Sequence, residues 1–545
     1  MKKFFTGLAI LFAFFISPSF AIEIKTTLPT FDVVLNGAKI ENENRQFPLL
    51  VYKDITYIPM TYYDCRYLGL ISNWNCETNS LSIEKSNITC AYRDYGCEWK
   101  NESKYEAKVC DFNVLVNDKL IDNSQEKYPL LIFRDITYFP LTWRFAVEEF
   151  GWNYSFDIEN GLVIDSDNYH TQIFDLPNCS GMFVTDGLYY YYNGKWEDKN
   201  VIYKVPIDDI SKPEIIHEVL DSDMSKSASL QMINGEIYIH YFCGSGPTMS
   251  TEYYYKIEDD GTTARKNPGN YSGGKHGYSE VTRESDGIFV KFINEFFDSP
   301  SKIVYSVNDV ETEVKDMPGR IKIGRRRNGE QDYSSNTKYD CIQIYNGKIY
   351  YTAIDLDKTE DSALYCIDTL TGKNEKVIDS VWGFYVYNAW SNEKQASTTM
   401  IIYDSNGSIM RYEELTGNMR MIEKCDIDGM VLADATGNNC IYTTQKTLKG
   451  DRTIVKAFGD YANGYSSING LVIGDTQEGT YTNIVGDKLI IRFVGEAKDG
   501  IRLLIVDETN IENQFKSADV ANEVFIHDNT IYYMIENNIV VKVDL

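Results

Sequence analysis

The sequence is poor in histidine and has no C-x-x-C pair. Among its 545 residues there are five histidines, and they are far apart along the chain. They are His170, His217, His240, His276 and His527. Structural zinc sites are usually built from closely spaced cysteines and histidines. We therefore expect neither a structural metal site nor a metal cofactor.

Long apolar runs are missing after the N-terminus, so we expect no transmembrane segment in the mature chain. The N-terminus combines Lys2 and Lys3, an apolar block, and the small residues Ser19 and Ala21. That order is typical of a secretory signal peptide cleaved near Ala21. A membrane anchor is the weaker alternative, because the block is shorter than the ~20 residues that cross a bilayer. The mature chain is expected to be secreted or at the cell surface.

Basic residues are outnumbered by acidic ones. The chain has 53 Lys and Arg against 80 Asp and Glu, a net charge of −27. Such a polyanion is repelled by nucleic acids and by anionic lipids, so neither is expected as a main partner. One stretch is basic, with Arg320, Lys322, Arg325, Arg326 and Arg327. We interpret it as a solvated loop balanced by acidic neighbours; docking of an anionic polymer is the alternative.

Cysteines are unusually frequent in one part of the chain. There are 11 in total, and five of them fall between residues 65 and 110. These are Cys65, Cys76, Cys90, Cys97 and Cys110. In an exported protein such cysteines usually form disulfides, and an odd total leaves at least one thiol free or paired between chains. A Cys65–Cys76 disulfide is favoured, because a helix and the strand after it can bring the two together.

A segment of about 40 residues occurs twice. The copies are FDVVLNGAKIENENRQFPLLVYKDITYIPMTYYDCRYLG and FNVLVNDKLIDNSQEKYPLLIFRDITYFPLTWRFAVEEFG. Such repetition indicates two copies of one structural unit. Each copy is interpreted as a set of short strands with one helix. In the first copy Asn36-Gly37 predicts a hairpin turn, Thr61 a helix N-cap and Gly69 a helix end.

The order of these motifs resembles a known domain family. An N-G or N-D hairpin, then PLL-hydrophobic-[KR]-D-I-T-Y-[IF]-P, a helix ending in Leu-Gly or Phe-Gly, and a closing strand are similar to the copper amine oxidase N-terminal (stalk) domain of Gram-positive exported proteins. The resemblance covers residues 31–85 and 112–166. It implies a spacer module that stands off from, or associates with, the cell envelope. The Cys-rich connector, residues 87–110, departs from the family pattern.

The resemblance does not extend to the catalytic domain that gives the family its name. Amine oxidation needs a tyrosine in an Asn-Tyr-Asp or Asn-Tyr-Glu setting, which becomes the quinone cofactor, and three histidines on copper. The chain offers only Asn168-Tyr169-His170, Asn153-Tyr154-Ser155 and Asn270-Tyr271-Ser272. We therefore expect no amine oxidase activity and no quinone cofactor.

From about Tyr169 onward the sequence predicts one strand after another. A phrase with a turn and a strand of the I-Y-Y type recurs eight times, at intervals of roughly 40 to 60 residues that are typical of propeller blades. The pattern is similar to a domain of Gram-positive surface proteins likened to the low-density lipoprotein receptor propeller. The segment HTQIFDLP, which starts at His170, is placed to complete the final blade. Two sandwiches or an open array are the alternatives.

Together these observations predict a mainly β protein. Two small α+β stalk-like units, each an antiparallel sheet plus one helix, are followed by a seven- or eight-bladed β-propeller. The expected divisions are a signal peptide (1–21), stalk-like repeat 1 (28–86), the Cys-rich connector (87–110), stalk-like repeat 2 (111–167) and the propeller-like domain (170–545).

The sequence contains no recognisable catalytic set. The stretch 464–468 lacks the second glycine of a nucleophile elbow and is predicted to be a loop. Cys243 is predicted on a turn with a structural role, since no histidine neighbours it. Acidic residues at 355–361 and at Asp426 and Asp428 only partly match a calcium loop. We therefore predict a non-enzymatic protein.

Aromatic residues are abundant, and core packing is their main expected role. The chain has 41 tyrosines, with runs at 189–192 and 253–255. Alternation along a strand places half of each run in the core, while the outward half could contact sugar or protein. The favoured hypothesis is an envelope protein whose propeller binds another envelope protein or a cell-wall glycan. A propeller enzyme acting on extracellular polysaccharide and a purely structural spacer are the alternatives.

Overall fold

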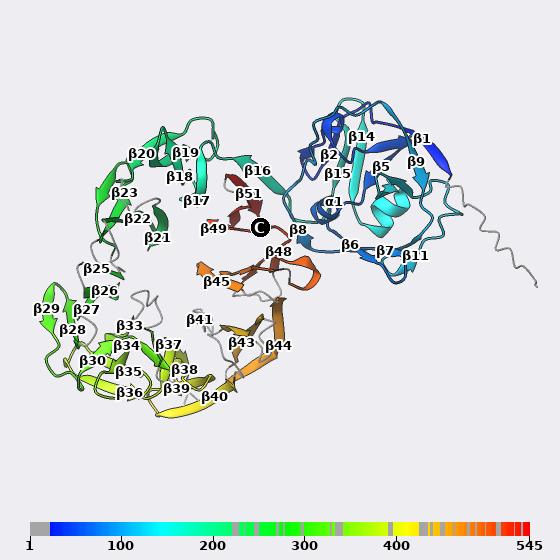
Figure 1. Cartoon of the computed structure of the whole chain (residues 1–545). Coiled ribbons are helices and arrows are strands. Elements are labelled where there is room, and N and C mark those ends of the chain that lie inside the picture. Colours follow the sequence, from blue (N-terminus) through cyan, green and yellow to red (C-terminus); the bar gives the residue numbers. More distant parts are fainter. Residues whose placement is uncertain are drawn as a thin grey trace, which may run out of the picture. The chain divides into compact units, whose positions relative to one another are not determined.

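The computed structural model shows two units (Figure 1). One contains the residues up to Asn87 together with Tyr92–Asn168, and the other contains Ile88–Ala91 and Tyr169–Leu545. The structure describes residues 22–220, 228–233, 235–244, 250–268, 272–275, 278–295, 299–327, 330–332, 342–390, 396–424, 434–435, 440–446, 453–461, 464–476, 480–485, 488–495, 497–507, 514–527, 529–535 and 538–545. The predicted signal peptide lies outside these residues. No helix among them is long and apolar enough to cross a membrane.

Six strands of the first unit close into a small barrel. In order they are β1 (Glu23–Thr27), β4 (Leu50–Tyr52), β5 (Ile55–Pro59), β13 (Ile136–Pro140), β12 (Leu131–Phe133) and β9 (Lys104–Val109). The two copies of the ITY[IF]P motif form neighbouring antiparallel strands, with Phe139 opposite Ile58. The equivalent residues Tyr57 and Tyr138 are buried in the barrel core. Both repeats thus build one barrel.

Outside the barrel, each repeat pairs its first strand with the last strand of the other repeat. Strand β2 (Val33–Leu35) runs parallel to β15 (Gly161–Asp165), and β10 (Asn113–Val116) runs parallel to β7 (Ser80–Lys85). Two four-stranded sheets are completed by β3 (Ala38–Lys39), β14 (Asn153–Asp157), β6 (Leu70–Asn75) and β11 (Lys119–Leu120). The repeats are therefore halves of one folded unit, because the closing strand of each also pairs with the first strand of the other.

The turn and helix predictions for the first repeat are confirmed. Asn36 and Gly37 have φ angles of 43° and 85°, which suit the tight turn between β2 and β3. The Thr61 hydroxyl accepts a hydrogen bond from the Asp64 amide at the start of α1 (Tyr62–Tyr67), and Gly69, with φ 74°, ends it. The second repeat has a π-helix, η2 (Arg144–Glu149), instead. Short 3-10 turns are η1 (Asn42–Asn44) and η3 (Lys498–Gly500).

The second unit consists of consecutive antiparallel sheets, here called blades. The first blade contains β17 (Cys179–Thr185), β18 (Tyr189–Trp196), β19 (Lys199–Pro206) and β20 (Glu214–Glu218), and the second contains β21 (Ser229–Ile233), β22 (Glu236–Gly244), β23 (Ser250–Ile257) and β24 (Thr263–Arg265). The third blade contains β25 (Ser272–Lys275), β26 (Tyr278–Ser285), β27 (Ile288–Glu295), β28 (Ser301–Val307) and β29 (Val310–Glu313). The fourth blade contains β30 (Ile321–Ile323), β33 (Ile342–Tyr345), β34 (Lys348–Asp355), β35 (Ala363–Asp368) and β36 (Asn374–Ile378). A small hairpin of β31 (Arg325–Arg327) and β32 (Glu330–Asp332) follows β30. One residue pair, Thr251 with Lys275, joins the second and third blades.

The last four blades continue this order. The fifth blade contains β37 (Val381–Trp390), β38 (Ala396–Asp404), β39 (Ser408–Glu413) and β40 (Asn418–Lys424), and the sixth contains β41 (Asp434–Ala435), β42 (Cys440–Lys446), β43 (Thr453–Tyr461) and β44 (Gly464–Thr476). The seventh blade contains β45 (Thr480–Val485), β46 (Lys488–Phe493), β47 (Leu503–Asp507) and β48 (Gln514–Ser517). The eighth blade contains β49 (Glu523–His527), β50 (Thr530–Met534), β51 (Ile539–Asp544) and β16 (Thr171–Asp175). Within the described residues the unit thus forms eight blades, a β-propeller.

The N-terminal strand of the propeller completes its last blade, as the sequence predicted. Strand β16 pairs antiparallel with β51, with Ile173 opposite Val541. An apolar cluster then joins the last blade to the first, with Tyr532 and Met534 packed among Phe183 and Tyr190. The order of blades therefore returns to its start.

The Cys-rich connector is divided between the two units. Its first residues form β8 (Ile88–Thr89), which adds a parallel fifth strand beside β48 of the seventh blade. The buried carboxylate of Asp519 accepts hydrogen bonds from the Ala91 amide at 2.6 Å and the Tyr533 hydroxyl at 2.8 Å. Residues further along form β9 of the barrel. The connector is thus part of both folds.

Candidate functional site

Three tyrosines from the second blade form a stack, which we name the tyrosine ladder. Tyr241 lies on β22 opposite Tyr253 on β23, and Tyr255 follows two residues later on the same face. The ring centroids are 5.7 Å apart for Tyr241 and Tyr253, 5.9 Å for Tyr241 and Tyr255, and 6.3 Å for Tyr253 and Tyr255. The interplanar angles are 11°, 9° and 6°. Alternation along β23 thus assigns Tyr253 and Tyr255 to one face, as predicted.

The ladder lies over the apolar cluster between the first and second blades. Tyr253 and Tyr255 pack against this cluster, which contains Val184, Ile202 and Ile239. The Tyr241 ring is buried, whereas those of Tyr253 and Tyr255 are only half-buried. The ladder therefore combines a fixed apolar base with aromatic surface that remains accessible.

Cationic and polar groups border the ladder. The Arg265 guanidinium lies 4.3 Å from the centre of the Tyr253 ring, and the His217 ring lies 4.5 Å from that of Tyr255. His217 Nδ1 is 3.0 Å from Thr263 Oγ1, and Nε2 is 3.3 Å from the Tyr241 hydroxyl. Burial lowers the pKa of His217, against a smaller opposing effect of the Glu218 charge. A neutral imidazole and a guanidinium thus border the aromatic surface.

The other tyrosine run, 189–192, has a mainly structural role. Tyr190 and Tyr192 are fully buried in the cluster between the last and first blades, and Tyr191 is buried in the cluster below the ladder. Tyr189 is half-buried, and the Lys204 ammonium lies 4.0 Å from its ring centre. The prediction of core packing for part of each run is confirmed.

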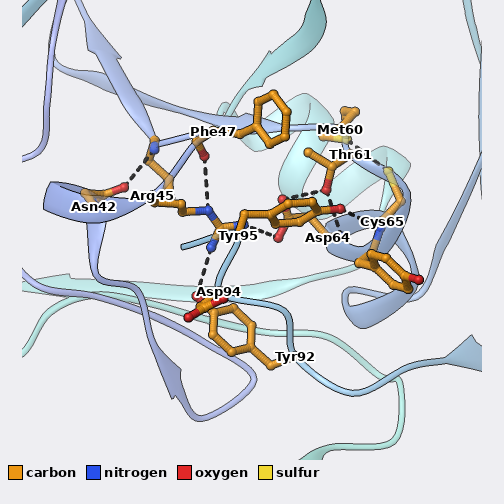
Figure 2. Close-up of polar contacts among 12 residues, drawn as sticks. Asn42, Arg45, Phe47, Met60, Thr61, Asp64, Cys65, Tyr92, Asp94 and Tyr95 are labelled. Atoms are coloured by element: carbon orange, nitrogen blue, oxygen red, sulfur yellow. Dashed lines mark hydrogen bonds and ion pairs between the residues drawn. The ribbon is translucent and has the colours of Figure 1, made fainter. Parts of the chain in front are cut away.

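A buried ion pair forms the polar centre of the first unit (Figure 2). Arg45 pairs through Nη2 with Asp64, and the two side chains are 1% and 3% exposed. Arg45 also donates to the Tyr92 hydroxyl at 2.9 Å and to the Phe47 carbonyl at 3.1 Å. Asp64 accepts from the Thr61 hydroxyl at 2.7 Å. The pair links the loop before β4 to α1 and the Cys-rich connector, so its role is structural.

The predicted disulfide between Cys65 and Cys76 is not formed, because the two side chains have different surroundings. Cys65 is buried on α1 with its sulfur 3.8 Å from that of Met60, whereas Cys76 is exposed after β6. Cys97 and Cys110 also have free thiols, and Cys90 is buried in the propeller unit. Burial raises the pKa of Cys65 to about 12 and that of Cys110 to about 11.

Basic residues of the stretch 320–327 bind acidic side chains and carbonyl groups of the fourth blade. Arg320 forms an ion pair with Asp357 at 2.8 Å, and the buried Arg326 donates to the Glu360 carbonyl at 3.2 Å. The interpretation as a solvated loop balanced by acidic neighbours is confirmed for Arg320. It is wrong for Lys322 and Arg326, which are buried on strands β30 and β31. The same contacts occupy part of the acidic stretch 355–361, and Asp426 and Asp428 lie outside the described residues.

Two further predictions of loops are wrong. Residues 464–468 start the long strand β44, and Cys243, which has a free thiol, lies within β22. Among the described residues, no group of three or more His, Cys, Asp or Glu side chains is placed to hold a metal ion.

Sequence reasoning found the tyrosines but missed the groups that border them. His217, Thr263 and Arg265 come from β20 and β24, which lack any local motif. The positions of Thr263 and Arg265 follow from the pairing of Tyr255 with Arg265 and of Ile257 with Thr263, whereas His217 belongs to the first blade, where it lies opposite Ile202. A correct register for the second blade would have brought both residues to the ladder.

Comparison with solved structures finds distant likenesses. No protein-family model and no curated protein matches the sequence. BamB from Moraxella catarrhalis is 8% identical, with a TM-score of 0.33 over 69% of this chain and 96% of its own. A europium-containing methanol dehydrogenase is 9% identical, with a TM-score of 0.33 over 66% and 84%. A puromycin hydrolase is 10% identical, with a TM-score of 0.32 over 65% and 58%. The fold assignment rests on the strand pairings of this chain.

Proposed function

We propose that this chain is an exported envelope protein in which the unit of the two repeats acts as a stalk and the propeller binds a protein or glycan ligand. The tyrosine ladder is the observation that carries the proposal. The N-terminal signal-like sequence and the resemblance of the repeats to stalk domains support the envelope location. Amine oxidation is not part of the proposed function, since the quinone motif is missing from the sequence.

The ladder has the properties of a recognition surface. Tyrosine combines a large rigid ring with a hydroxyl group, so it contributes contact area at low entropic cost. The half-buried rings of Tyr253 and Tyr255 stack on Tyr241 and are nearly parallel to each other. Because the surface is already ordered, little conformational entropy is lost when a ligand binds.

The borders of the ladder supply directional contacts. Arg265 offers guanidinium donors for ligand carboxylate or hydroxyl groups, and the hydroxyls of the tyrosines donate and accept hydrogen bonds. A ligand with a flat or weakly polar face and hydroxyl or acidic groups at its edge fits this arrangement. Envelope glycans and protein loops both have such features.

Binding is tested with the purified mature chain and fractionated envelope material. We expect co-sedimentation with a cell-wall glycan or an envelope protein fraction. The Tyr253→Ala/Tyr255→Ala double variant should weaken the binding about tenfold or more, because truncation of a central interface tyrosine costs more than about 1 kcal/mol. Trp196→Ala is the matched control, since Trp196 is 49% exposed on the neighbouring blade and lies outside the ladder. Unchanged binding by the double variant would contradict the proposal.

Export is tested separately. When the full-length gene product is expressed, the mature protein should be recovered outside the cytoplasm with Ile22 as its first residue. Intact residues 1–21 on a cytoplasmic product would exclude the envelope location.

A further inference from the structure

The face of the second blade opposite the ladder brings three chemically active side chains together. Ser229 on β21 pairs with His240 on β22, which in turn pairs with Tyr254 on β23. Glu252 lies two residues before Tyr254 and therefore shares its face. The hairpin registers thus place Ser229, His240 and Glu252 side by side.

Hydrogen bonds connect these three side chains in series. Ser229 Oγ is 3.1 Å from His240 Nδ1, and His240 Nε2 is 2.6 Å from Glu252 Oε1. A carboxylate oxygen accepts, so Nε2 carries the hydrogen and Nδ1 presents its lone pair to the serine hydroxyl. A hydroxyl nucleophile, a base within hydrogen-bond reach and a third group that orients the base are the signature of an activated serine.

Neighbouring side chains hold the imidazole in place. The Tyr254 ring stacks on His240 with centroids 4.4 Å apart, and its hydroxyl donates to Glu252 Oε1 at 3.3 Å. The His240 and Glu252 side chains are 14% and 3% exposed. Among the residues that the structure describes, the second carboxylate oxygen, Oε2, is buried and has no hydrogen-bond partner. A buried carboxylate with an unsatisfied oxygen is stabilised electrostatically when the imidazole beside it becomes positively charged.

Two other contacts compete for the serine and the imidazole. Ser229 Oγ also lies 3.3 Å from the His240 carbonyl oxygen. Gln231 Nε2 lies 3.1 Å from Ser229 Oγ and 3.4 Å from His240 Nδ1. The serine proton therefore has two acceptors, and only transfer to Nδ1 generates a nucleophile.

We propose that Ser229 is the nucleophile of an ester-hydrolysing site, with His240 as its general base and Glu252 as a positioning residue. Ser229 Oγ bonds to the ester carbonyl carbon, and its proton passes to Nδ1. The carbon–oxygen bond to the leaving alcohol then breaks, and Nδ1 returns the proton to that alcohol. Water releases the acid from the acyl-serine by the same proton transfers, which regenerates the Ser229 hydroxyl.

The substrate class follows from the surroundings of the triad. Phe242 is 43% exposed, and its ring lies 5.2 Å from that of His240. It offers an apolar contact for the acyl portion of a carboxylic ester. This activity goes beyond the proposed ligand binding, and it uses the opposite face of the same blade, so either function can fail alone.

The proposal is tested on the intact mature protein with a biotinylated alkyl fluorophosphonate. This probe forms a stable bond to an activated serine oxygen as fluoride leaves. Mass spectrometry should locate the adduct on Ser229, and Ser229→Ala should abolish it. Ser211→Ala is the control, because Ser211 is exposed and its hydroxyl donates to Asp209 rather than to an imidazole. That variant should be labelled at the parent rate.

The base and its positioning residue are distinguished by chemical rescue. His240→Ala should lower the labelling rate about 100-fold or more, and added imidazole should restore part of it, which a purely structural histidine would not show. Glu252→Ala should also slow labelling, with partial recovery in Glu252→Asp. Thermal unfolding of each variant confirms that it is folded. No Ser229 adduct on the folded parent protein, or equal labelling of a folded His240→Ala variant, would overturn the proposal.

Discussion

The Arg45–Asp64 pair of the first unit and the tyrosine ladder of the propeller unit both combine charged and aromatic side chains, but they differ in burial. The ion pair is almost fully buried, and its polar atoms bond within the chain. The ladder keeps two half-buried rings. A saturated, buried centre stabilises a fold, whereas ordered but accessible aromatic surface is available for recognition. The following changes should separate these two roles.

The largest expected effect comes from breaking the buried pair. Asp64→Ala leaves the Arg45 guanidinium buried without its counter-charge, which costs about 3–5 kcal/mol. Native-state hydrogen exchange of β5 peptides would measure the loss. Ligand binding by folded protein should be unchanged, since the ladder belongs to the other unit.

The second repeat provides the matched control for this prediction. In that repeat Glu126 occupies the position that aligns with Arg45, and it forms an ion pair with Arg144. The acidic partner therefore stands where the first repeat has the basic one. The Glu126 and Arg144 side chains are 20% and 41% exposed. Glu126→Ala should cost no more than about 1 kcal/mol because water screens the pair. Equal costs for Asp64→Ala and Glu126→Ala would contradict the distinction drawn from burial.

A smaller effect is expected where the connector joins the seventh blade. Asp519→Ala removes the acceptor of the Ala91 amide and the Tyr533 hydroxyl. Leaving buried donors unsatisfied costs about 1–3 kcal/mol. Exchange of the amides at 88–91 should become faster, while that of β5 stays at the parent rate. Uniform change in both units would show that Asp519 has no local role.

The local stability of the structure around the ladder should decrease at acidic pH. The folded-state pKa of His217 is lowered by burial, so below the ordinary histidine pKa of about 6.5 the unfolded state binds more protons. The stabilisation present above that pH is therefore lost as pH falls through the folded-state pKa. Exchange of β20 and β22 amides at pH 7.5 and 5.5 measures this, and His217→Gln should reduce the difference. An unaltered pH dependence in His217→Gln would exclude this histidine as the cause.

Thiol reactivity gives the mildest test of burial. Because burial raises the pKa of Cys65 to about 12, its thiol stays protonated and enclosed at pH 8. Iodoacetamide should modify the exposed Cys76 in the folded protein while Cys65 reacts only after denaturation. A disulfide between Cys65 and Cys76 in the exported protein would contradict this prediction, because neither thiol would then react with iodoacetamide.

Local signals in the sequence predicted much of the fold. Each of the eight recurring phrases contains a strand of a different blade, and the pairing of the segment after His170 with the last strand was also predicted. These features depend on strand patterns and turns, which neighbouring residues determine.

Features that depend on distant partners were harder to predict. Because the two repeats have nearly the same strands, their sequences cannot tell pairing within a repeat from exchange between repeats. The strand at Ile88–Thr89 is too short to give a periodic signal. The prediction of a Cys65–Cys76 disulfide was wrong because it depended on where two side chains point, which the local sequence does not determine. Ser229 and His240 become neighbours only when Ile233 is paired with Glu236 across the hairpin.

The central claim is that the propeller binds its ligand through the tyrosine ladder. The most direct measurement is the dissociation constant of the bound envelope fraction, once isolated, for the mature protein and for its Tyr253→Ala variant by titration calorimetry. We predict an increase of about fivefold or more for Tyr253→Ala, the equivalent of about 1 kcal/mol or more, and no change for Trp196→Ala. An unchanged dissociation constant for folded Tyr253→Ala would contradict the account.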